Sequence, residues 1–261
     1  VISFTGGTST GAALAAVAAP MFKKISLELG GKNPTIVFAD CDYDDTIQQT
    51  VRAAFTNQGQ ICLCGSRILV EQSIYENFVD DFVARVKEMK VGDPLEKDSN
   101  IGSVVSLAQY EKVRSYIQLA QEEGGTILCG GLEKPPVNDR CKDGWFISPT
   151  VIIGLDANCR TNQEEIFGPV VTIQPFREES EAIEIANSTR YGLAATIWTQ
   201  NLKRAHRVAA AIDSGIVWVN SWLVRDLRTP FGGMKDSGIG REGGFEALHF
   251  FTEAKNIFIR L

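Results

Sequence analysis

Histidine is scarce in this sequence, which contains only His206 and His249. Both lie in segments with a helical pattern and far from any group of cysteines, so we expect them to be surface or packing residues. A zinc site needs ligands in recognisable Cys or His pairs, and a cysteine hydrolase needs a histidine beside its thiol. The sequence therefore argues against a metal site and against hydrolysis by a Cys–His pair.

Long apolar runs and an excess of basic residues are also missing. No apolar run approaches the roughly 20 residues that span a bilayer, and the first residues lack the leader pattern of a signal peptide. The formal net charge is −6, so the composition lacks the excess of positive charge that is typical of proteins that bind nucleic acid or an anionic membrane. We expect a cytoplasmic protein that binds neither nucleic acid nor membrane.

The six cysteines lack the dense spacing of a small secreted domain, so we expect reduced thiols. Cys62 and Cys64 are too close together and too isolated to predict half of a zinc site.

The chain length of 261 residues suits one large α/β domain, or one domain with pieces of another. The sequence begins without Met, on an apolar strand-like stretch that runs into a glycine turn. We therefore expect a C-terminal fragment of a longer protein.

Apolar β-rich runs alternate with amphipathic segments along most of the chain. This alternation predicts an α/β fold with a mostly parallel sheet and crossover helices. The predicted strands are residues 35–38, 66–70, 126–128, 147–153, 170–176, 194–198 and 216–219, and the predicted helices are 43–57, 73–89, 107–123, 180–187 and 202–212.

Irregular segments interrupt this pattern. Residues 92–100 and 130–144 are predicted as surface loops, and residues 229–244 form a glycine-rich stretch that suits no regular element. The last residues, 254–261, alternate loosely and end apolar. They predict a terminal strand that needs a partner sheet from this chain or from another subunit.

A thiol and a carboxylate stand out as candidate reactive groups. Cys62 follows Asn57-Gln-Gly-Gln60 at the end of a predicted helix, where small and amide residues leave room for a reacting group. Glu28 lies between two leucines and is followed by Gly30-Gly31, which suggests a carboxylate beside a cavity. Partial burial would raise its pKa and suit it to accept a proton from water.

The N-terminal segment Phe4-Thr-Gly-Gly-Thr-Ser-Thr-Gly11 has a strand, a glycine turn and then an alanine-rich helix over residues 11–19. Such a turn aims backbone N–H groups at an anion such as pyrophosphate, although glycine turns after strands are common.

Five motifs in this order resemble the aldehyde dehydrogenase superfamily. They lie at residues 4–11, 27–34, 55–62, 163–170 and 230–244 and extend over nearly the whole chain. The resemblance implies an aldehyde dehydrogenase-like catalytic domain at residues 29–244, preceded by the last segment of a Rossmann-like NAD domain at 1–28. Residues 245–261 would form an oligomerisation strand of a homodimer or homotetramer.

The resemblance also assigns roles. Cys62 would be the nucleophile and Glu28 the base that hydrolyses a thioester, with NAD as hydride acceptor. The Cys62 backbone N–H would stabilise the oxyanion, together with an Asn that the family has upstream of residue 1. The implied NAD contacts are Thr5, Gly6, Gly7, Thr8, Leu29, Glu165 and Phe167. Most of the NAD domain would also lie upstream, so we expect the fragment alone to be inactive.

The segment Trp222-Leu-Val-Arg-Asp-Leu-Arg228 is similar to a branch of the family that oxidises 2-aminomuconic and 2-hydroxymuconic semialdehydes, the former in tryptophan breakdown by the kynurenine route. An Arg in a mostly apolar pocket is costly without an anion, so a substrate carboxylate would explain it. We expect Arg225 in that role and Arg228 second, with Trp222 beside the substrate. Alternatively, Arg225 pairs with Asp226 or with another acidic neighbour.

Other functions stay open at this point. The substrate could be retinal or another apolar aldehyde, or the chain could be a non-catalytic truncated form that keeps the fold and the subunit contacts. Glu28 disfavours a coenzyme-A-acylating enzyme because it provides a hydrolytic base.

Overall fold

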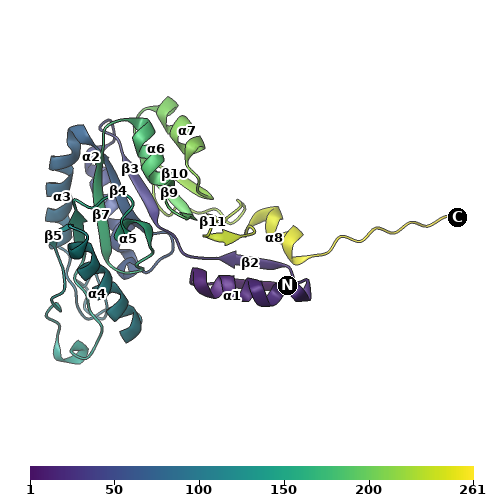
Figure 1. Ribbon diagram of the computed structural model, residues 1–261, viewed down its shortest axis with the longest axis horizontal. Coiled ribbons are helices and arrows are strands. Elements are labelled where there is room, and N and C mark those ends of the chain that lie inside the picture. Colours follow the sequence, from purple (N-terminus) through teal and green to yellow (C-terminus); the bar gives the residue numbers. More distant parts are fainter.

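The computed structural model describes residues 1–261 and is built around a seven-stranded sheet (Figure 1). Its strand order is β10-β9-β3-β4-β7-β6-β5, and every neighbouring pair is parallel except β5 with β6. The strands are β3 (Asn33–Val37), β4 (Gly65–Glu71), β5 (Thr126–Cys129), β6 (Thr150–Ile153), β7 (Val170–Phe176), β9 (Ala194–Trp198) and β10 (Ile216–Val219). The predicted α/β class with a mostly parallel sheet is confirmed.

Helices cover both faces of this sheet because its strands carry apolar side chains on alternating sides. Helices α2 (Tyr43–Phe55) and α3 (Tyr75–Lys87) pack on one face, over Val37, Ile68 and Val171. On the other face, α6 (Glu179–Asn187) and α7 (Leu202–Ala211) cover residues such as Ile36 and Leu69. Helix α4 (Leu107–Glu122) packs on the β5–β6 end of that second face. These helices match the predicted ones closely.

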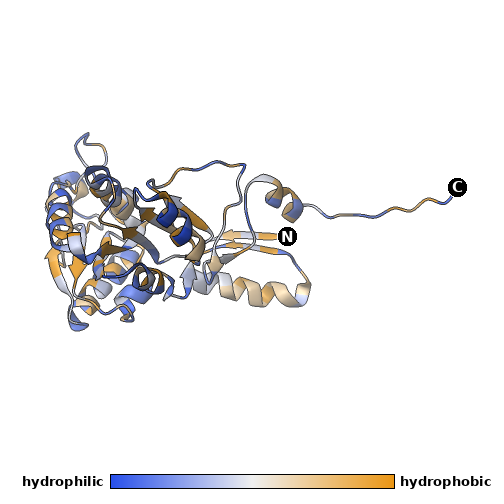
Figure 2. Ribbon diagram, turned by 90° about the horizontal axis from the view of Figure 1, so that it is seen from above, coloured by the Kyte–Doolittle hydropathy of each residue, from blue (hydrophilic) through white to orange (hydrophobic).

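A small sheet lies beside the main body and brings the N-terminal residues together with residues 238–239. Strand β2 (Ile25–Glu28) pairs in parallel with β1 (Ile2–Thr5) and antiparallel with β12 (Gly238–Ile239). Helix α1 (Thr8–Ala18) connects β1 to β2 through a short 3-10 turn, η1 (Ala19–Met21). Figure 2 shows this unit projecting from the large sheet, with an apolar α1 on its outer side.

The structure differs from the sequence prediction in three segments. Residues 229–244 are not irregular throughout, since they contain β12 and β11 (Met234–Lys235), the latter paired with β8 (Tyr191–Gly192). Strand β6 begins at Thr150 rather than at residue 147, because Pro149 has no N–H for the ladder. Residues 254–261, predicted as a strand that pairs with a sheet of this chain or of another subunit, form no strand within this chain, and residues 253–261 extend away from the body after α8 (Gly244–Phe251) (Figure 1).

None of the helices combines the length and the apolar character that a bilayer crossing requires.

Candidate functional site

Glu28 ends the central strand of the small sheet, where backbone contacts from both sides hold it. Its carbonyl accepts a hydrogen bond from the Gly6 N–H (3.0 Å), and the next N–H, that of Leu29, donates to Ser237 O (2.9 Å). Only 5% of Glu28 is exposed. The β2 pairing therefore fixes a buried carboxylate at the point where the two sheets meet.

Cys62 follows a tight turn that ends helix α2. Asn57, Gln58 and Gly59 adopt positive φ angles of 52°, 57° and 67°. Gly59 has to be glycine there, because an added Cβ would lie 2.1 Å from Gly168 O. This close approach brings the thiol segment against the loop that contains Glu165 and Phe167.

Glu165 sits against the glycines that follow Glu28. The Gly31 N–H donates to Glu165 Oε1 (3.1 Å), and a Cβ on Gly30 would lie 2.2 Å from Glu165 Oε2. Gln109 of helix α4 donates its side-chain amide to Phe167 O (2.7 Å). The glycine pair beside Glu28 thus makes room for the Glu165 carboxylate, and this close packing was not evident from the sequence.

One cavity of about 490 Å³ brings most of the predicted site together, a volume that suits a small-molecule ligand. Its walls are Thr5, Gly6, Gly7, Glu28, Leu29, Gly30, Gln60, Ile61, Cys62, Gln109, Lys112, Glu165 and Phe167. Thr8 begins α1 but does not line the cavity. Gln109 and Lys112 were not predicted, because their helix shows only an ordinary amphipathic pattern in the sequence.

Burial dominates the electrostatics of the two candidate reactive groups. Burial, and then the charge of Glu242, raises the pKa of Glu28 to about 7. Burial, and then the charges of Glu28 and Glu165, raises the pKa of Cys62 to about 11. Arg225 favours the charged form of both groups and so acts against these shifts. A carboxylate that titrates near neutral pH beside a protonated thiol can accept and return protons.

Arg225 lies exposed on the loop after β10, at a separate cavity of about 130 Å³ that Glu242 also lines. Its guanidinium carbon is 4.2 Å from the centroid of the Phe231 ring. The alternative pairing of Arg225 with Asp226 is not formed, because Asp226 instead binds Arg228 through several hydrogen bonds.

Arg228 and Trp222 are placed less favourably for substrate contact. The side chain of Arg228 is 89% exposed and already paired. Trp222 is buried, donates its Nε1–H to Leu63 O (3.0 Å) and packs with Ala53 and Leu193. In this position Trp222 packs against the segment that carries Cys62. This favours a structural role over contact with a substrate.

The structure contains no group of three or more His, Cys, Asp or Glu side chains that could hold a metal ion.

Comparisons with known proteins agree with this geometry. Residues 1–257 match the model of the aldehyde dehydrogenase family. The chain is 50% identical, over its full length, to 2-aminomuconic semialdehyde dehydrogenase of Homo sapiens, of which it covers 54%. It is also 50% identical to 2-hydroxymuconic semialdehyde dehydrogenase of Pseudomonas putida, with 99% of this chain and 53% of that protein aligned.

Solved structures give the same result. The crystal structure of betaine aldehyde dehydrogenase from Staphylococcus aureus in complex with NAD+ superposes with a TM-score of 0.91 at 44% identity. The match covers 95% of this chain and 49% of that one. The chain thus spans about half the length of the relatives it matches. With a family match that extends over almost every residue, the chain belongs to the aldehyde dehydrogenase family.

Proposed function

We propose that this chain supplies the thiol-bearing part of an NAD-dependent dehydrogenase that oxidises a carboxylated semialdehyde to the corresponding acid. The leading substrate is 2-aminomuconic 6-semialdehyde. The observation that carries the proposal is the single cavity lined by Cys62, Glu28 and Glu165 together with the Gly6–Gly7 turn. Relatives that are about half identical and are named for this substrate support its chemical class.

The cavity walls suit a nicotinamide dinucleotide. We assign residues 5–8, at the start of α1, to its phosphates, because a helix N-terminus directs N–H groups and a positive dipole end outward. Glu165 would bind a ribose, with Phe167 and Leu29 packed beside the nicotinamide, and Lys112 adds a cation to the same cavity. When bound, NAD supplies the acceptor for the hydride of the aldehyde.

The chain's own residues carry the remaining chemistry. At a pKa of about 11 the Cys62 thiol is almost fully protonated at neutral pH, so it needs a nearby base to release its proton. Glu28 is suited to accept it, because its pKa of about 7 leaves much of it ionised. The Cys62 sulfur then attacks the aldehyde carbon to give a thiohemiacetal, whose oxyanion the Cys62 backbone N–H would stabilise. Glu28 releases the thiol proton to bulk water before it acts again. After oxidation to the thioester, the ionised Glu28 takes a proton from the water that hydrolyses it, and the Cys62 sulfur leaves as the thiolate.

Arg225 is the proposed partner of the substrate carboxylate. It has no acidic partner in the structure, and its charge acts on both Glu28 and Cys62. In a protein that also carries the rest of the NAD domain, Arg225→Ala should raise KM for 2-aminomuconic semialdehyde by about tenfold or more, because a charge-assisted pair contributes more than about 1.4 kcal/mol. The matched control is Arg228→Ala, whose side chain is exposed and bound to Asp226.

The same assay is run with retinal, the alternative apolar substrate, and kcat/KM is compared for the two aldehydes. Apolar residues such as Ile216, Trp218 and Phe231 around the smaller cavity favour this alternative. If Arg225→Ala leaves oxidation of the semialdehyde intact, or if retinal has the higher kcat/KM, the proposed substrate class is wrong.

We further propose that residues 1–28 are the end of an NAD domain, 29–244 the catalytic domain and 245–261 an oligomerisation segment of a cytoplasmic homodimer or homotetramer. The exposed apolar side chains Ile257, Phe258 and Ile259 support the last assignment. Residues 1–261 alone should bind NAD weakly and be inactive, because they correspond to about half of each relative. Calorimetric titration of NAD into residues 1–261 that gave micromolar affinity would contradict this.

A further inference from the structure

The side-chain amide of Asn33 joins three separate segments beneath the candidate site. Its Nδ2 donates to Cys62 O (2.7 Å) and to Cys64 O (2.9 Å). Its Oδ1 accepts from the Ala194 N–H (3.1 Å). Asn33 is only 4% exposed; its bonds to Cys64 O and to the Ala194 N–H are buried, and its bond to Cys62 O is part-buried. Both N–H donors of the amide are therefore used on the thiol segment alone.

The surrounding backbone leaves room for this amide. Asn33 is the first residue of β3, and the register of β3 against β4 shifts between Asn33 and Pro34. A Cβ on Gly31 would lie 2.6 Å from Asn33 Oδ1 and 3.1 Å from Cys62 O. Glycine at position 31 thus lets the amide and the thiol segment approach each other.

We propose that Asn33 is a positioning residue that fixes the Cys62 segment relative to the strand leading from Glu28. The proposal rests on the assignment of Cys62 as the nucleophile. Only four residues separate Glu28 from Asn33, and the tight Gly30-Gly31 pair lies between them. One amide therefore sets how far the thiol stands from the carboxylate, although it lines neither of the two cavities described above.

Only an amide satisfies all three partners. An aspartate would set a carboxylate against two carbonyl oxygens, and a serine hydroxyl could donate to only one of them. Asn33→Ser is therefore the mild variant and Asn33→Asp the severe one. Loss of the Asn33 hydrogen bonds to Cys62 O and Cys64 O should let the Cys62 thiol turn towards water. This exposure removes part of the burial that raises the pKa of the thiol.

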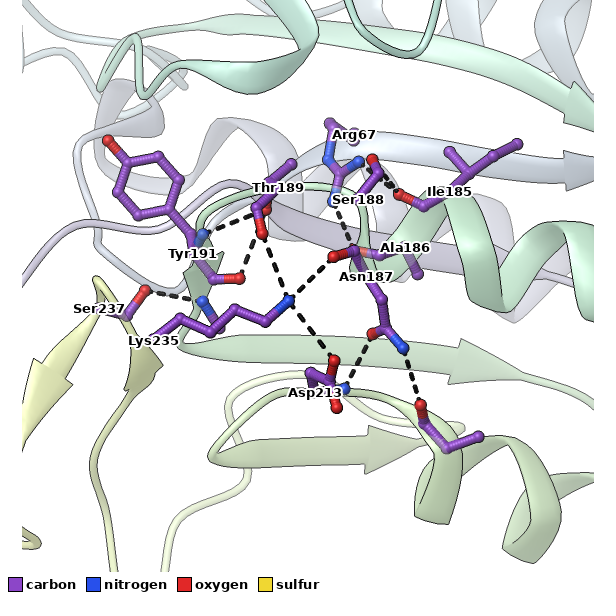
Figure 3. Close-up of polar contacts among 12 residues, drawn as sticks. Arg67, Ile185, Ala186, Asn187, Ser188, Thr189, Tyr191, Asp213, Lys235 and Ser237 are labelled. Carbon is purple, nitrogen blue, oxygen red and sulfur yellow. Dashed lines mark hydrogen bonds and ion pairs between the residues drawn. The ribbon is translucent and has the colours of Figure 1, made fainter.

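The test is the rate at which iodoacetamide alkylates each cysteine of residues 1–261, followed by peptide mass spectrometry across a range of pH. This measurement needs no dehydrogenase activity, so it can fail independently of the proposed function, which is tested by turnover. Cys129 and Cys159 serve as internal references because both are half-buried and free. The matched control is Asn187→Ser, since the Asn187 amide likewise joins two backbone groups, Ala211 O and the Asp213 N–H (Figure 3).

In Asn33→Ser we expect Cys62 alone to react about tenfold faster near neutral pH, because a fall of about one unit in its pKa gives about ten times more thiolate. Its alkylation midpoint should move down from about 11, while Cys129 and Cys159 keep their rates. Asn33→Asp should enlarge the same change. An unchanged Cys62 midpoint in Asn33→Ser would overturn the proposal. Equal acceleration of all six cysteines would also overturn it, because it would show that Asn33 stabilises the whole fold and not the Cys62 segment. The same change at Cys62 in Asn187→Ser would overturn it as well.

Discussion

Lys32 offers a stringent test of the packing beneath the site. Only 1% of this residue is exposed, and its Nζ has no hydrogen-bond partner. Burial, and then the charge of the buried Arg67, lowers the pKa of Lys32 to about 7. The ammonium form is therefore poorly stabilised in the folded chain, and Lys32→Met should relieve this cost.

The sign of the pH dependence follows from proton binding. The unfolded chain keeps Lys32 protonated up to its ordinary pKa of about 10.4, whereas the folded chain releases the proton above about 7. Between these values the unfolded state binds more protons, so Lys32 makes the free energy of unfolding rise with pH, by up to about 1.4 kcal/mol per unit. The cost is fully present below about 7 and is lost as pH approaches 10.4, a total on the order of 3–5 kcal/mol.

Urea unfolding of the wild type and of Lys32→Met at several pH values measures this directly. We expect the variant to be more stable by a few kcal/mol near pH 7 and the difference to shrink towards pH 10. Titrating groups that do not interact with Lys32 cancel in the difference, and exposed Lys87→Met provides the matched control. The reasoning is refuted if the difference does not change with pH, or if Lys32→Met destabilises the fold throughout.

Other parts of the molecule give shorter tests. In a protein that also carries the rest of the NAD domain, turnover should fall as pH drops through about 7, where Glu28 becomes protonated. In the same protein, Glu28→Gln should lower steady-state NADH formation by about 10²–10⁴-fold. A residual rate near that of the wild type would exclude Glu28 as the base. Gly59→Ala should lower thermal stability by more than Gly124→Ala, since both have positive φ but only Gly59 faces an oxygen, Gly168 O, at 2.1 Å. Deletion of residues 254–261 should reduce the oligomer size measured by light scattering without changing the melting temperature, and an unchanged size would exclude the tail as the contact.

The sequence was sufficient for features encoded by local patterns. Alternating apolar runs located the strands of the large sheet, and helical spacing such as Ile47, Val51 and Ala54 located α2. The family motifs named Glu28, Cys62 and Glu165, which the fold brings to one cavity.

Features that depend on distant partners could not be predicted. Strand β12 forms because Gly238 pairs with Glu28, far away in the sequence, and a glycine-rich stretch carries no strand pattern of its own. Residues 254–261 show the alternation of a strand but meet no partner in this chain. Asp226 has arginines on both sides, and only the loop geometry decides that it binds Arg228.

The position of β2 between β1 and β12 has a consequence for how the protein is made. The strand that ends in Glu28 leaves the ribosome before the large sheet does, but its second neighbour is not synthesised until residue 238. Pairings of such long sequence separation form slowly and late. The large sheet can therefore assemble first, whereas the backbone around the carboxylate is fixed only after residue 238 has been made. A polypeptide that ends before residue 238 would contain the Cys62 segment but would lack β12, the strand that pairs with β2 at Glu28.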